Sequence, residues 1–174
     1  DKDGFIDYKD IYNKILEYKP KMVVVGASAY SRTIHYDRIR EIIDRAGEKI
    51  DFTPYMFVDM AHVAGLIAGG VHPSPFGYAE IINSTTQKSL RGNRGGLIFC
   101  KPELAKKIDS AVFPYAQGGS LMNEIAGKAV TAEEALRPEF KTYAQMVVAN
   151  AKAMAEEFVK MGYDVITGGT DNHM

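Results

Sequence analysis

Three short stretches place polar side chains directly after apolar segments, where an α/β protein carries its reactive groups. They are residues 26–31, 59–62 and 84–88. Ligands of open α/β sheets bind beyond the carboxyl ends of the strands, so these stretches are candidates for one shared site. The amine of Lys88 could act as a nucleophile, and the carboxylate of Asp59 could pair with a ligand cation. The sequence therefore predicts a site that combines an amine with a carboxylate.

Each of these side chains also has a structural interpretation. Asp59 ends an apolar run, so we expect a carboxylate with little access to solvent, but a turn or helix-capping aspartate fits the same position. Lys88 follows a run of hydroxyl residues that favours a desolvated amine, and a surface lysine is the alternative. His62 could stack on the same ligand, or it could be a hydrogen-bonded histidine at the start of a helix.

Two glycine-rich loops could bind an anion. Residues 91–96 offer backbone N–H groups and the guanidinium groups of Arg91 and Arg94, which suit a carboxylate or a phosphate. Residues 117–120 (Gln-Gly-Gly-Ser) precede a predicted helix, and the N-terminus of a helix attracts anions. Either loop could also be a structural turn.

The sequence predicts no metal site. Residues 1–7 resemble the middle of a calcium-binding loop, but the first liganding acid and the closing glutamate are absent, so we expect a simple turn. The four histidines show no metal-ligand spacing with the cysteine or with an acidic cluster.

Apolar periodicity predicts the elements that must position these groups. The expected helices cover residues 8–18, 36–46, 102–109 and 121–161, the last divided at Pro138, and the expected strands cover residues 22–25, 55–58, 80–83 and 96–100. Asp7 is placed to cap the first helix. We expect the first strand to be buried, and three methionines to fill the core: Met146, Met154 and Met161. Alternating strands and helices predict an α/β fold with a largely parallel sheet.

Composition limits the partners and the compartment. The 174 residues include 21 basic and 22 acidic side chains, so no broad basic field favours nucleic acid or an acidic membrane. The longest uncharged stretch, residues 60–79, contains prolines and histidines and does not predict a membrane span. The single cysteine, Cys100, favours a reducing compartment, and we expect a cytoplasmic protein. An organelle stays open, because a targeting segment would precede Asp1.

Four sequence motifs closely resemble the serine hydroxymethyltransferase family of pyridoxal-phosphate (PLP) enzymes. They are Val-Asp-Met-Ala-His-Val-Ala-Gly-Leu (58–66), Val-His-Pro-Ser-Pro (71–75), Ser-Thr-Thr-Gln-Lys-Ser-Leu-Arg-Gly-Asn-Arg-Gly-Gly (84–96) and Gly-Gly-Thr-Asp-Asn-His (168–173). The resemblance runs over essentially the whole chain. It implies the aspartate-aminotransferase-like fold (PLP fold type I), a mostly parallel mixed sheet flanked by helices. Residues 1–174 would be the central portion of the PLP-binding large domain, truncated at both ends.

The resemblance implies a role for the residues of the predicted site. Lys88 would form the Schiff base with the PLP aldehyde, and Asp59 would pair with the protonated ring nitrogen, which keeps the ring able to accept electrons. His62, Ser28 and Thr85 would also contact the cofactor.

The resemblance also implies roles for residues of the glycine-rich loops, and one residue differs from the family pattern. Arg94 would lie near the substrate, and Gly118 and Gly119 would donate N–H groups to the phosphate of the partner subunit's cofactor, so the resemblance implies a homodimer or a tetramer. Gln87 stands where the family usually has histidine, which leaves substrate preference and proton handling open.

The reaction implied is the reversible transfer of the hydroxymethyl carbon of L-serine to tetrahydrofolate, giving glycine and 5,10-methylenetetrahydrofolate. Two alternatives remain, another PLP aldolase or aminotransferase of the same fold and a non-catalytic structural fragment. The family's N-terminal catalytic residues and its C-terminal substrate-binding domain are not found in the sequence, so we expect weak activity at most from this chain alone.

Overall fold

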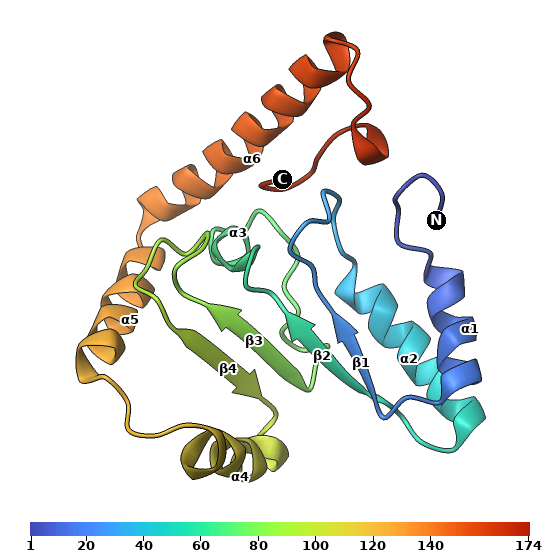
Figure 1. Cartoon of the computed structure of the whole chain (residues 1–174), viewed down its shortest axis with the longest axis vertical. Coiled ribbons are helices and arrows are strands. Elements are labelled where there is room, and N and C mark those ends of the chain that lie inside the picture. Colours follow the sequence, from blue (N-terminus) through green and yellow to red (C-terminus); the bar gives the residue numbers. More distant parts are fainter.

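The fold is built on a four-stranded sheet. A computed structural model describes all 174 residues. The strands are β1 (Met22–Val25), β2 (Tyr55–Asp59), β3 (Ile81–Thr85) and β4 (Gly96–Cys100), in that spatial order. The first three strands are parallel, and β4 runs antiparallel to β3 (Figure 1). The predicted mostly parallel sheet is therefore confirmed.

Six α-helices pack around the sheet and leave one of its faces open. They are α1 (Tyr8–Tyr18), α2 (Tyr36–Ile50), α3 (Ala64–Ala68), α4 (Pro102–Ser110), α5 (Met122–Ala135) and α6 (Pro138–Lys160). Four have bounds close to those expected, α2 extends beyond its expected end at residue 46, and α3 was not predicted. A π-type turn at Ala111–Ala116 and a 3-10 turn at Ile166–Gly168 complete the regular structure. The Asp7 carboxylate accepts hydrogen bonds from the N–H groups of Lys9 and Asp10, each at 3.0 Å, which confirms the predicted cap of α1.

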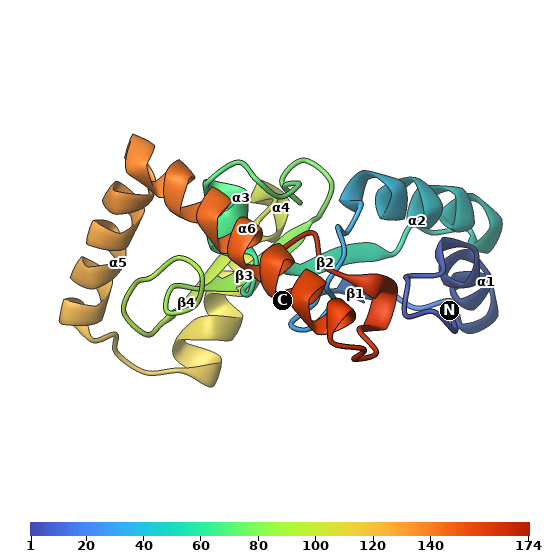
Figure 2. The ribbon, with the colours of Figure 1, turned by 90° about the horizontal axis from the view of Figure 1, so that it is seen from above.

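The core lies on one face of the sheet. Met56, Val58 and Ile82 alternate with more exposed residues along β2 and β3, so their side chains share a face. They pack against the apolar stripe of α2, which includes Ile39 and Ile43. Viewed from above, α2 and α3 lie along the same side of the sheet (Figure 2).

The opposite face of the sheet is open. Val24 in β1 is 68% exposed and Ile98 in β4 is 50% exposed. The expected burial of β1 is wrong for this reason, because only Val25 is buried. Strands of parallel sheets are usually covered on both faces, and here helices cover one.

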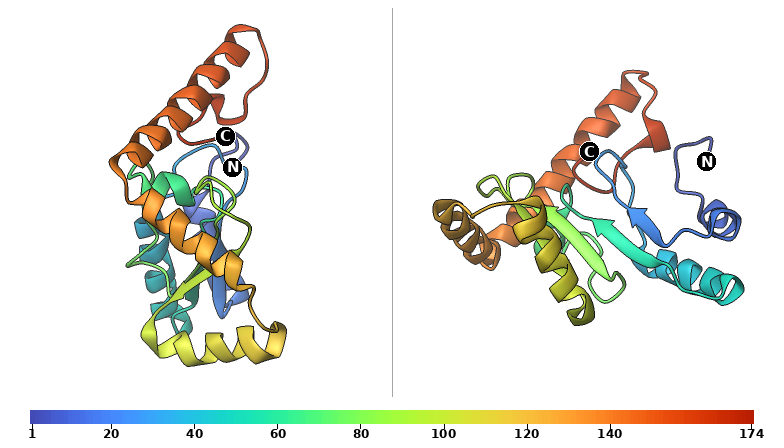
Figure 3. Two further views of the ribbon diagram at one scale, coloured as in Figure 1. Left: turned by 90° about the vertical axis from the view of Figure 1, so that its left-hand side faces the viewer. Right: turned by 60° about the horizontal axis from the view of Figure 1, so that its bottom comes forward.

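Helix α6 departs from the expected core packing. It begins at Pro138, as predicted, and extends away from the sheet (Figure 3). Met146, Met154 and Met161 are all exposed, so the prediction that they fill the core is wrong. Beyond α6, residues 166–174 turn back toward the loops that follow the strands (Figure 1). We call residues 166–174 the C-terminal segment. No helix is both long enough and apolar enough to cross a membrane.

Candidate functional site

The carboxyl ends of the parallel strands bring the three predicted stretches together. Asp59, the last residue of β2, pairs in register with Asn83 of β3, and Thr85 ends β3 two residues later. Because residues two apart point to the same side of a strand, all three side chains lie on the open face of the sheet. Ser28 lies in the loop that follows the neighbouring strand β1 and is exposed.

Ser89 ties the loop of Lys88 to the segment of His62. Its hydroxyl donates to the carbonyl oxygen of His62 at 2.7 Å and accepts from the N–H of Gly65 at 2.9 Å. A Cβ on Gly65 would lie 2.1 Å from the carbonyl oxygen of Ser89, so only glycine permits this approach. The hydrogen bonds therefore place Lys88, which precedes Ser89, beside His62.

The charges of Asp59 and Lys88 both act on the imidazole of His62. Burial lowers the pKa of His62, the positive charge of Lys88 lowers it further, and the negative charge of Asp59 partly opposes both effects. The geometry agrees with this. Asp59 and His62 lie three residues apart at the end of β2, and the Ser89 hydroxyl binds the residue after Lys88 to the carbonyl oxygen of His62. The three residues therefore belong to one candidate site.

The structure corrects the expected environment of the two charged groups. Asp59 is exposed rather than shielded from solvent, because the face of the sheet that carries it has no helix over it. One of its oxygens accepts from the N–H of Ala61 at 2.9 Å, so Asp59 also has the turn-forming role of the structural interpretation. Lys88 is likewise exposed, not desolvated, and its amine is in no ion pair.

Polar atoms without partners lie next to Asp59. The side-chain oxygens of Asn83 and Thr85 are buried, and neither has a hydrogen-bond partner within the chain. Buried polar atoms are normally hydrogen-bonded, so unpaired ones mark a place where a polar ligand can bind. This set of residues fits the chemical groups of PLP. The Lys88 amine could bind its aldehyde, the Asp59 carboxylate could pair with its ring nitrogen, and the two unpaired oxygens could bind its polar groups.

The loop between β3 and β4 is held by its own hydrogen bonds. The hydroxyl of Thr86 donates to the carbonyl oxygen of Asn93 at 2.5 Å, and the amide oxygen of Gln87 accepts from the N–H of Gly95 at 3.2 Å. The resemblance implies a catalytic position for Gln87, which stays a prediction, and its side chain contacts the backbone of this loop.

The two loop arginines differ in their surroundings. The guanidinium of Arg91 lies 4.1 Å from the ring centroid of Tyr143 and 5.2 Å from that of Phe140. These cation–π contacts hold it against α6. Both Arg91 and Arg94 are exposed, so the predicted anion-binding role of each stays a prediction.

Gly118 and Gly119 do not join this site. The segment that carries them lies between the turn after α4 and the start of α5 (Figure 1). Both glycines are exposed, and a Cβ added to either would contact nothing within 4 Å. Their predicted role, phosphate binding in a partner subunit, stays a prediction.

One residue next to the site was missed by the sequence analysis. The Nε2 atom of His173 lies 3.3 Å from Nδ1 of His62, although 111 positions separate them in the sequence. The resemblance of the Gly-Gly-Thr-Asp-Asn-His motif was the available signal for His173. In the core, burial and to a smaller extent the charge of Asp59 raise the pKa of Tyr36 to about 12.

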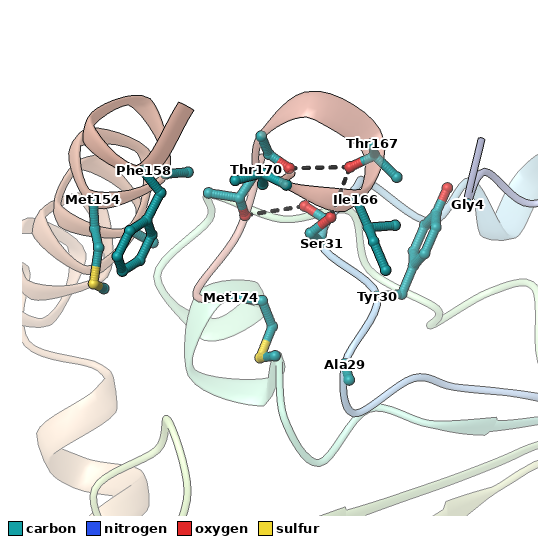
Figure 4. Close-up of a pocket in the computed structure, with 14 residues that line it drawn as sticks. Gly4, Ala29, Tyr30, Ser31, Met154, Phe158, Ile166, Thr167, Thr170 and Met174 are labelled. Carbon is teal, nitrogen blue, oxygen red and sulfur yellow. Dashed lines mark hydrogen bonds between the residues drawn. The ribbon is translucent and has the colours of Figure 1, made fainter. Parts of the chain in front are cut away.

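A cavity of about 300 Å³ lies beside the site, between α6 and the C-terminal segment. Met154 and Phe158 of α6 face Ile166 and Tyr30 across it (Figure 4). Its hydroxyl groups are used within the chain, since Ser31 and Thr167 are hydrogen-bonded to each other at 2.9 Å. No group of three or more His, Cys, Asp and Glu side chains could hold a metal ion.

The fold and the site define a class of protein. A mostly parallel α/β sheet with a carboxylate at one strand end and a free lysine after the next strand is the arrangement expected of a PLP-binding domain.

Comparison with known proteins identifies the family within that class. The family model for serine hydroxymethyltransferase matches residues 1–174, and the chain belongs to this family, which has PLP fold type I. It is 54% identical over 99% of its length to serine hydroxymethyltransferase 3 of Pseudomonas fluorescens strain Pf0-1. It is 53% identical over its full length to serine hydroxymethyltransferase 1 of Pseudomonas savastanoi pv. phaseolicola. The chain spans 40% and 41% of the length of these two relatives.

Proposed function

We propose that this chain forms the PLP-holding part of an enzyme that transfers the hydroxymethyl carbon of L-serine to tetrahydrofolate. The observation that carries the proposal is the position of Asp59 at the end of β2, next to the loop of Lys88, which Ser89 binds to the backbone of His62 and Gly65. Family membership supports the choice of reaction, because the family depends on PLP and uses tetrahydrofolate as co-substrate.

The residues of the site would divide the work of holding the cofactor. Lys88 would attach the aldehyde carbon, since its amine is exposed and in no ion pair. Asp59 would pair with the ring nitrogen through the oxygen that Ala61 does not occupy. Thr85 and Ser28 would supply hydroxyl groups, and Arg94 would bind an anionic group of the substrate. When bound, PLP supplies an electron-accepting ring that makes cleavage of a bond to the amino-acid α-carbon possible.

A labelling experiment tests the role of Lys88. We expect the chain mixed with PLP to show the absorbance of a lysine-bound cofactor, and borohydride reduction followed by peptide mass analysis to place the label on Lys88. The Lys88→Arg variant should lose both signals, because a guanidinium does not condense with the aldehyde. Lys49→Arg, on the exposed side of α2, is the matched control and should keep both. A label that stays on another lysine would contradict the proposal.

An assay of serine cleavage tests the reaction. We expect glycine to form from serine in a manner that requires tetrahydrofolate. Cleavage of serine or threonine at the same rate without folate would instead support an aldolase of the same fold. Low activity of the chain is sufficient for this test, because the test compares the cleavage rate with tetrahydrofolate to the rate without it.

The assembly and the compartment are further parts of the proposal. We propose a homodimer in which Gly118 and Gly119 face the partner subunit. Apolar side chains exposed around them support an interface there, and they are Tyr115, Leu121, Met122 and Ile125. We propose a cytoplasmic location on the basis of the single, half-buried Cys100, which cell fractionation would test.

A further inference from the structure

His62 and His173 form a hydrogen bond at the edge of the site. The burial of His173 indicates which of the two rings is the donor. Nδ1 of His62 and Nε2 of His173 lie 3.3 Å apart, with ring centroids 5.5 Å apart. One nitrogen must carry the proton and the other must accept it. The remaining nitrogen of His173, Nδ1, is buried and has no partner.

The unpaired Nδ1 atom of His173 selects one of the two arrangements. If His62 were the donor, a neutral His173 would carry its proton on Nδ1, and a buried N–H would have no acceptor. If His173 is the donor, its Nδ1 is a lone pair, and no buried N–H is left unpaired. An orphaned N–H is the rarer and more costly defect in proteins, so the second arrangement is favoured.

The surrounding charges keep both rings neutral. Burial lowers the pKa of His173, and His62 and His72 lower it further. Burial and the charge of Lys88 lower the pKa of His62, and Asp59 acts in the opposite direction. The net direction is downward for each ring, so the neutral forms dominate at neutral pH.

The backbone around His173 is held firmly enough to orient its ring. Asn172, which is 1% exposed, donates from Nδ2 to the carbonyl oxygen of Tyr30 at 2.8 Å and accepts from the N–H of Met174 at 3.0 Å. The N–H of Asp171 donates to the carbonyl oxygen of Ser31 at 2.8 Å. Hydrogen bonds from Asp171 and Asn172 thus anchor the C-terminal segment directly before His173, and the bond from Met174 closes a turn around it.

We propose that His173 is a positioning residue, whose Nε2–H donates to Nδ1 of His62 and thereby fixes the proton of the His62 ring on Nε2. The C-terminal segment then controls the orientation of the His62 ring. The effect on cofactor binding rests on the proposed function, whereas the hydrogen bond between the two rings does not.

Nitrogen NMR of the chain labelled at histidine tests the hydrogen bond without any cofactor. We expect Nδ1 of both rings to be unprotonated at neutral pH and Nε2 of both to be protonated. We also expect a coupling across the hydrogen bond from Nε2 of His173 to Nδ1 of His62. A proton on Nδ1 of His62, or the absence of the coupling in the folded chain, would overturn the proposal.

Three variants test whether the hydrogen bond matters for binding. His173→Leu removes the donor, and the Kd for PLP should rise about fivefold, the loss of one neutral hydrogen bond. His173→Gln keeps an N–H donor and should stay within about twofold of the parent chain. Glu157→Ala breaks an exposed ion pair with Lys160 on α6, outside the C-terminal segment, and should match the parent chain.

The outcomes separate this proposal from the proposed function. Equal losses in His173→Leu and His173→Gln would show that the side chain acts by packing, and would overturn the positioning role. If the parent chain does not bind PLP, the proposed function fails, and the NMR result alone decides the hydrogen bond.

Discussion

Asp59 has a structural role in a turn and a proposed role in cofactor binding, and each can use a different carboxylate oxygen. One oxygen caps the turn through the N–H of Ala61, and the carboxylate charge reaches His62. The structural and the functional interpretations of this residue are therefore compatible. Its exposure means that the charge needs no internal partner, because solvent stabilises it.

Substitution of Asp59 by asparagine separates the two roles. The amide oxygen can still accept from Ala61, so the thermal midpoint should hardly change. The lost charge should raise the Kd for PLP about tenfold, as expected for a hydrogen bond to a charged group. Asp59→Ala should lose both the turn and the binding. Unchanged PLP affinity in Asp59→Asn would rule out its pairing with the cofactor.

The same substitution should move the pKa of His62. The charge of Asp59 raises this pKa, so Asp59→Asn should lower it further, and the titration of the His62 imidazole by NMR measures the change. Lys88→Gln should act in the opposite sense and serves as the matched control. A shift of the same sign in both variants would contradict the shared site.

Among the elements, Glu80 joins the strands to α2. It accepts from the backbone N–H of Met56 at 2.7 Å, from Arg40 at 3.1 Å and from Lys101 at 2.8 Å. Its side chain is 14% exposed, and that of Arg40 is 13% exposed. One carboxylate thus connects α2, β2 and the residue after β4 at the edge opposite to the site.

Removal of this carboxylate should be costly. Glu80→Ala leaves the Met56 N–H and the Arg40 guanidinium without their acceptor, which should lower the free energy of unfolding by about 3 kcal/mol. Urea denaturation measures the change. Glu17→Ala, which breaks an exposed pair with Lys14, is the control and should have little effect. Equal stability of the two variants would contradict this role of Glu80.

The same contacts predict the pH dependence of stability. Burial raises the pKa of Glu80, but hydrogen bonds from Lys101 and Met56 and the charge of Arg40 lower it more, so it lies below the ordinary 4.5. The stabilisation is complete above pH 4.5 and is lost as the pH falls through the lowered folded-state pKa. Glu80→Gln should therefore show a smaller loss of stability on acidification than the parent chain.

For the whole molecule, the uncovered surfaces are the main feature. One face of the sheet, the outer side of α6 and the start of α5 all expose apolar side chains. Apolar surface on this scale indicates contacts with other protein surface. The proposed dimer assigns the start of α5 to a second copy of the chain.

A charge placed on α5 tests that assignment. Met122 is 70% exposed, so Met122→Glu should leave the fold intact but convert a dimer to a monomer, because the interface would bury an unpaired charge. Light scattering after gel filtration measures the mass. Tyr18→Glu at the end of α1 is the control, with a similar exposure of 68%. A parent chain that is already monomeric, or equal dissociation in both variants, would contradict the interface.

Local sequence determined most of the elements, although α3 was not predicted and α2 extends beyond its expected end. Asp7 and Pro138 begin their helices as predicted, because capping and the fixed φ of proline act within one turn. The three stretches with polar side chains were also predicted to meet, since parallel strands present their carboxyl ends at one edge. The sequence motifs indicated the family, and the comparisons with known proteins confirmed it.

Tertiary structure alone decided the environment of the site residues. The exposure of Asp59 and Lys88 depends on which face of the sheet the helices cover, and no local pattern specifies that. The guanidinium of Arg91 lies against the rings of α6, and His173 contacts His62 although most of the chain separates them in sequence. Burial and long-range contact are properties of the packed chain, because they depend on residues that are neighbours in space and distant in sequence.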